Sequence, residues 1–145
     1  LIQHSRKALG AQATAQGSTC VMAAGVWPGV SNLMAAECLS VLDESPSCSR
    51  DPQRKAIFDF YTAGTGGAGA AVLAATFLIL AEDATVVRGG EKGGAKPYAP
   101  KPEALGGPAA KFGPALAPKP VFRMNLLEPV SIADTFPSVT DAECF

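Results

Sequence analysis

One long uncharged stretch constrains this sequence more than any other feature. From Phe60 to Ala81 the chain has no charged side chain, with Asp59 just before the stretch and a Glu-Asp pair just after it. As an α-helix rising 1.5 Å per residue the stretch would span about 33 Å, close to the roughly 30 Å of hydrocarbon in a bilayer. It therefore predicts a single transmembrane helix over about residues 60–81.

Small side chains recur at every fourth position of this stretch and would give the helix two smooth rows. Such rows let another helix backbone approach closely within a membrane. Each glycine costs helix stability about 1 kcal/mol, so we expect the helix to pack against a partner rather than stand alone. The predicted helix-packing residues are Thr62, Gly66, Ala70 and Ala74 in one row, and Ala63, Gly67, Ala71 and Ala75 in the other.

The glycines of the same stretch support an alternative interpretation. Residues 64–69 read Gly-Thr-Gly-Gly-Ala-Gly, and they resemble the G-x-G-x-x-G fingerprint of the Rossmann family, with an apolar run before them and a helical pattern after them. The resemblance implies a dinucleotide-binding oxidoreductase whose helix N-terminus holds a pyrophosphate. A Rossmann helix shows a polar face to water, and residues 70–81 have none. The membrane helix is therefore preferred, with a buried helix of a soluble protein as a further alternative.

Residues 1–50 form an N-terminal arm outside the membrane in this interpretation. The arm has no acidic residue before Glu37 and resembles an organelle transit peptide in composition. A short amphipathic helix is expected near residues 31–44, with Ser31 as its N-cap and Pro46 just beyond its end. Its apolar side would carry Leu33, Met34, Cys38, Val41 and Leu42.

The predicted span belongs to a region of residues 51–87. The residues after this region divide into two further regions. Residues 88–120 are rich in Gly, Pro and Lys, so we expect an extended tail without regular helix or sheet, held by neighbouring subunits. Residues 121–145 are more apolar and are expected to dock into partner pockets, a small self-packed cap being the alternative. The predicted partner-docking residues are Tyr98, Phe112, Phe122, Leu126, Leu127 and Phe136.

The cysteines and the single histidine give little support for chemistry. Cys38 and Cys48 have nine residues between them, a spacing similar to C-x9-C helical hairpins of the mitochondrial intermembrane space, so they form either a disulfide or two reduced thiols. Zinc sites favour close cysteine pairs with histidines, and the only histidine is His4. No catalytic residue, no metal site and no enzymatic activity are predicted.

Together these observations predict a mainly α, single-pass membrane protein with a long irregular tail. We expect a non-catalytic accessory subunit of a large organellar energy-converting complex, photosystem-type in the thylakoid rather than respiratory in the inner mitochondrial membrane. Its expected partners are other membrane-protein subunits and lipid. No intrinsic cofactor is predicted, although contacts with chlorophyll, carotenoid or lipid fit this interpretation. The 12 basic and 13 acidic residues give no electrostatic footprint for nucleic acid, and no small-molecule substrate is expected.

Overall fold

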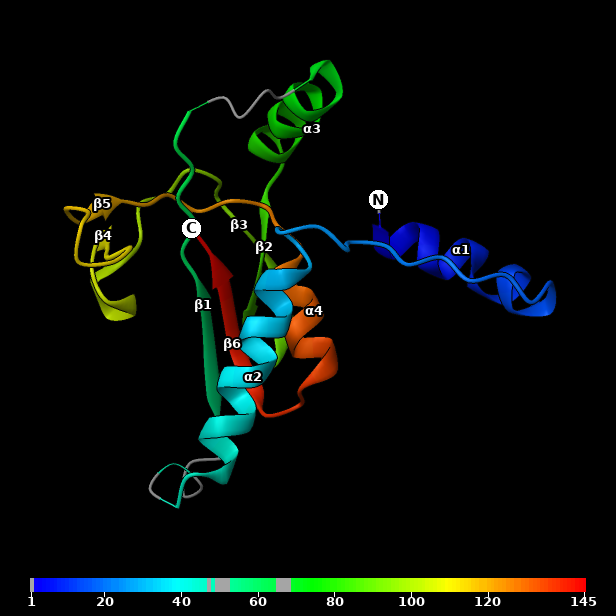
Figure 1. Cartoon of the computed structure of the whole chain (residues 1–145), viewed down its shortest axis with the longest axis horizontal. Helices are drawn as coiled ribbons and strands as arrows, with labels where there is room; N and C mark the ends of the chain where they lie inside the picture. Colours follow the sequence, from blue (N-terminus) through cyan, green and yellow to red (C-terminus); the bar gives the residue numbers. More distant parts are fainter. Residues whose placement is uncertain (1, 47, 49–52, 65–68) are drawn as a thin grey trace.

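A four-stranded sheet with two helices on one face forms the centre of the protein (Figure 1). The structure is a computed structural model that describes residues 2–46, 48, 53–64 and 69–145. Its helices are α1 (Ile2–Ala15), α2 (Val30–Glu44), α3 (Ala70–Ala81) and α4 (Glu128–Thr135), with a 3-10 turn η1 (Glu103–Leu105). Its strands are β1 (Arg54–Phe58), β2 (Ala84–Arg88), β3 (Glu91–Ala95), β4 (Ala109–Ala110), β5 (Lys119–Pro120) and β6 (Val139–Cys144).

The strand order in the main sheet is β1-β6-β2-β3. Strand β6 lies in the middle, where it pairs in parallel with β1 and antiparallel with β2, and β2 and β3 form an antiparallel hairpin. Strands β4 and β5 pair only with each other in a small second sheet. Strand β1 is therefore one edge of the main sheet.

The core lies between the sheet and the helices α2 and α4 (Figure 1). Alternate residues of a strand point to opposite faces, so one face of each strand supplies apolar side chains to this layer. The buried cluster consists of Leu39 from α2, Ile132 from α4, and Phe58, Val87, Val139, Ala142 and Cys144 from or beside the strands. Helix α1 contributes nothing to the buried core and extends away from the sheet in Figure 1.

The predicted transmembrane helix over residues 60–81 is wrong, and so is the integral-membrane location predicted from it. In the described ranges of the chain, no helix is both long enough and apolar enough to cross a membrane. The amide of Phe60 bonds to the carbonyl of Phe145 at 2.8 Å, which continues the pairing of β1 with the end of β6. Among the described residues of this stretch only Ala70–Ala81 is helical, and its 12 residues rise about 18 Å.

The predicted mainly α fold is also wrong, because the chain is mixed α/β. The glycine-rich start of region 88–120 is not irregular: Gly93 and Gly94 belong to β3, which β2 pairs along its whole length. Region 121–145, expected to dock elsewhere, supplies α4 and the central strand β6. The helix expected near residues 31–44 has its counterpart in α2, but Gly29 rather than Ser31 is its N-cap.

Candidate docking surfaces

Helix α3 is apolar on every side and none of its residues is buried. It stands at the end of the molecule, joined to the sheet by the segments before and after it (Figure 1). Four of its large apolar side chains are 50–70% exposed: Val72, Leu73, Phe77 and Leu78. A helix that is hydrophobic all round is normally surrounded by other apolar groups. The exposed α3 is therefore the strongest docking signal in the described residues.

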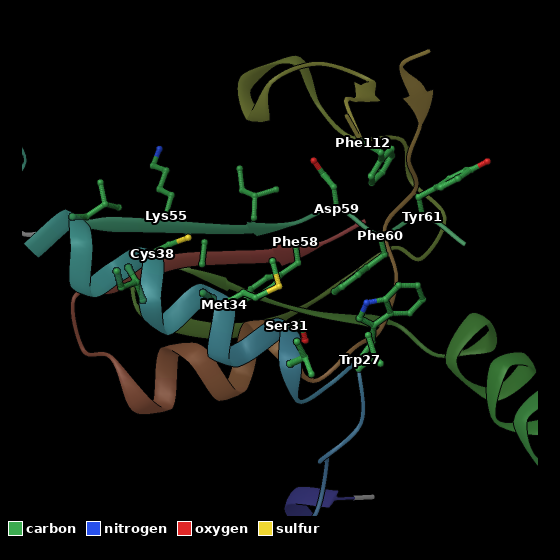
Figure 2. A pocket seen from close by; sticks show the side chains of 17 residues that line it. Trp27, Ser31, Met34, Cys38, Lys55, Phe58, Asp59, Phe60, Tyr61 and Phe112 are labelled. Carbon is green, nitrogen blue, oxygen red and sulfur yellow. The ribbon is translucent and has the colours of Figure 1, made fainter. Parts of the chain in front are cut away.

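A second apolar surface follows the edge of the main sheet, where a groove of about 510 Å³ lies between α2 and β1 (Figure 2). One side of the groove is a stripe of α2 residues at four-residue spacing: Val30, Met34, Cys38 and Leu42. Its other side is formed by β1 and by Asp59, the residue after it. Trp27 and Phe60 close one end of the groove, with their ring centroids 4.9 Å apart. All four stripe residues are exposed, so the groove is open and largely apolar.

The charged groups near this edge are matched mainly within the chain. Asp59, at the end of β1, accepts a hydrogen bond from the Lys101 ammonium at 2.6 Å, and Lys101 is only 7% exposed. Its second carboxylate oxygen, Oδ1, is buried without a hydrogen-bond partner in the described residues. On the same face of the sheet, the buried Glu143 accepts hydrogen bonds from Arg88 and Arg123.

Two further buried polar groups lie on the helix-covered side of the sheet. The Ser31 hydroxyl of α2 donates to Glu128 Oε1 of α4 at 2.8 Å, and Glu128 is completely buried. Burial, and then the nearby negative charges of Glu128, Glu143 and Asp59, raises the pKa of the Cys144 thiol well above its ordinary 9.0. A buried thiol that stays protonated is a poor nucleophile. Cys144 is therefore part of the core and not a reactive group.

The structure does not assemble the predicted helix-packing rows. Thr62 and Ala63 precede α3 and are not helical, while Gly66 and Gly67 fall outside the described residues. The remaining four, Ala70, Ala71, Ala74 and Ala75, are exposed on α3. Rows at four-residue spacing need one continuous helix, and α3 begins only at Ala70.

The predicted partner-docking residues are scattered through the fold. Tyr98 and Phe122 are exposed, whereas Leu126 and Phe136 pack against the core of their own chain. Phe112 packs against Tyr61 with ring centroids 5.3 Å apart, and Leu127 is the N-cap of α4. Of the two states left open for Cys38 and Cys48, the structure has the reduced one, because the two are not bonded to each other in the described part of the chain.

Sequence reasoning missed the groove because it assigned no strand to residues 54–58. The clearer signal was the β-branched run at residues 85–87, which marks a strand, whereas residues 54–58 offer only a short apolar run. The apolar side of α2 was found, but not the strand edge beside it. The edge strand is what turns that side of α2 into a groove.

The arrangement of β1, α3 and β2 differs from a dinucleotide-binding unit. In such a unit the strands before and after the helix are parallel and the helix packs on the sheet. Here β6 separates β1 from β2, which run antiparallel to each other, and α3 leaves the sheet. The glycine-rich loop falls mostly within residues 65–68, outside the described residues.

The described metal-ligand side chains do not gather into a site. Across residues 2–46, 48, 53–64 and 69–145, no group of three or more His, Cys, Asp or Glu lies close enough to hold a metal ion.

Comparison with known proteins gives no match with any family model, curated protein or solved structure. The candidate function therefore rests on the two apolar surfaces.

Proposed function

We propose that the protein is a non-catalytic accessory subunit of a larger assembly, and that α3 is the element by which it joins that assembly. The observation that carries this proposal is a helix without a polar face, none of whose residues is buried and most of which are exposed. Burying one large apolar side chain contributes about 1.5–3 kcal/mol. Four such side chains on α3 offer enough free energy for specific docking once a partner surrounds them.

The shape of α3 favours insertion into a partner over contact on one side. A helix that docks in a shallow groove needs an apolar stripe, with polar residues on its other face. Helix α3 is apolar on all faces and is held clear of the sheet, so a partner can enclose it (Figure 1). The photosystem-type or respiratory host expected from composition stays a prediction.

The test replaces two exposed side chains of α3 by a polar residue that keeps the helix. In the variant L73Q/F77Q we expect the protein to leave a high-mass complex and migrate as the small free form in native gels of detergent-treated cells. Glutamine is a good helix former, so the loss would reflect polarity and not unfolding. The affinity loss should be at least about 100-fold, the equivalent of roughly 3 kcal/mol.

The matched control is V21Q, which makes the same change at an exposed position outside α3. It should leave the protein in the complex. Wild-type protein that migrates as the small form, or L73Q/F77Q that stays in the complex, would contradict the proposal. Binding of the purified wild type to phosphatidylcholine vesicles, without any high-mass complex, would instead show that α3 enters lipid and would also contradict it.

A further inference from the structure

The outer edge of β1 carries backbone groups without hydrogen-bond partners in the described chain. The amides of Arg54 and Phe60 and the carbonyl of Phe58 all bond toward β6 and its neighbouring residues. Because successive residues of a strand point their backbone groups to opposite sides, those of Lys55, Ile57 and Asp59 point away from β6. No strand of the described structure lies on that side. The edge is therefore open to another extended chain.

We propose that the occupant of this edge is a second copy of the same chain, with the two β1 strands antiparallel about a two-fold axis at Ile57. This register joins the two sheets into one and places Lys55 of each copy opposite Asp59 of the other. The outward-pointing residues 55, 57 and 59 then form hydrogen-bonded pairs with the same residues of the second copy. The proposal uses elements other than α3 and goes beyond the proposed function.

Charge complementarity selects the second copy and this register. Residues 55–59 read Lys-Ala-Ile-Phe-Asp, so the segment carries a positive charge at one end and a negative charge at the other. Opposite charges facing each other across strands stabilise an antiparallel pair. The Asp59 side chain remains 24% exposed beside its ion pair with Lys101, so a second cation can reach the carboxylate.

The helix beside the edge supplies the apolar part of the interface. A two-fold axis through β1 and perpendicular to the sheet brings α2 of both copies to the same face, because a C2 interface uses the same patch on both subunits. Figure 2 shows Met34 and Cys38 on the α2 side of β1, along the stretch between Lys55 and Asp59. The four-residue stripe that contains them would pack against its counterpart and close the groove.

The first test is a cross-link whose rate depends on the register of the two β1 strands. In a background of C20S/C38S/C48S, the variant I57C places its two thiols across the axis, where paired Cα atoms are about 5.5 Å apart and within disulfide range. We expect oxidation to give a covalent dimer. The matched variant K55C lies on the same edge, but its two copies are about 14 Å apart and should cross-link at least tenfold more slowly.

The second test uses charge and needs no oxidation. The variant K55E places like charges opposite each other, and we expect the dimer dissociation constant from sedimentation equilibrium to rise at least about tenfold. The control K7E makes the same charge change on α1 and should leave the constant unchanged, as should L73Q/F77Q. Equal or absent cross-linking of I57C and K55C, or wild-type protein that stays monomeric at the highest concentration reached, would overturn the proposal.

Discussion

Cys144 lies in the core beneath α4, among apolar side chains and near three carboxylates. Its raised pKa links folding to pH in a definite direction. Below pH about 9 the thiol is protonated in both folded and unfolded chains, so its contribution to stability is fully present. Above that pH the unfolded chain loses the proton and the folded chain keeps it, so we expect stability to fall by up to about 1.4 kcal/mol per pH unit.

The measurement is urea unfolding of the wild type and C144A between pH 8 and pH 10.5. The wild type should lose stability more steeply with pH than C144A, whose other titrating groups are the same. Comparing slopes removes the constant cost of the small cavity that the alanine leaves. Parallel slopes would show that the thiol ionises as easily in the folded protein as in the unfolded chain.

Individual residues also show what the sequence could and could not predict. Asp59 directly precedes the uncharged stretch and Phe60 is its first residue. Both were interpreted by hydropathy alone. In the structure, Phe60 bonds to Phe145 and Asp59 bonds to Lys101, each far away in sequence. Such pairings depend on which distant segments meet, and no local pattern of charge or size contains that information.

At the scale of elements, α2 and α4 are joined by a buried hydrogen bond from Ser31 to Glu128 and by a partly buried one from Ser131 to Asn32. In S31A the buried carboxylate would lose this donor, and we expect a loss of about 1–3 kcal/mol in the free energy of unfolding. The control T135A removes an exposed hydroxyl that bonds within α4 and should cost less than about 0.5 kcal/mol. Urea unfolding at pH 7 gives both values.

A double variant shows whether the cost belongs to the unpaired carboxylate. In S31A/E128M both polar partners are replaced by apolar groups of similar size, and such replacement is close to neutral or stabilising. We therefore expect the double variant to recover most of the stability that S31A loses. If S31A/E128M is less stable than S31A, the Glu128 carboxylate stabilises the fold even without the Ser31 hydroxyl.

Helices were easier to anticipate from the sequence than strands. The apolar spacing over residues 31–44 indicated the range of α2, and the Ala/Leu-rich run at residues 70–81 indicated a helix at α3. Hydropathy extended that second helix too far, because a Gly-rich loop and an extended segment are just as uncharged as a membrane span. The five residues of β1 are too few for a clear alternating pattern, and β3 contains two glycines that normally weaken a strand.

At the scale of the whole molecule, the sheet depends on residues that were expected to be a separable tail. Truncation after Gly90 would remove β6, the strand between β1 and β2, together with α4. We expect the truncated chain to lose cooperative thermal unfolding completely, as followed by far-UV circular dichroism. A second truncation, which removes residues 1–18 with α1 but keeps the sheet, should retain a cooperative transition. A cooperative transition after the first truncation would contradict the central place of β6.

The whole molecule also bears on the predicted docking of the tail, residues 88–120. The structure explains why a tail that is rich in glycine and proline can be ordered: much of it is bonded to its own chain, as when the amide of Tyr98 donates to the carbonyl of Arg123 at 2.9 Å. Partners were therefore not needed to hold it. The absence of catalysis and the identity of the host stay predictions.

The place of β6 in the sheet also sets an order of events while the chain is being made. Arg54 of β1 pairs with Val139 of β6, so β1 is synthesised long before the strand that it joins in the described structure. The β2–β3 hairpin can close at once, but β1 must wait. Pairing over so long a sequence separation is slow. Until it occurs, the nascent chain exposes surfaces that aggregate, and we expect it to need chaperones during synthesis.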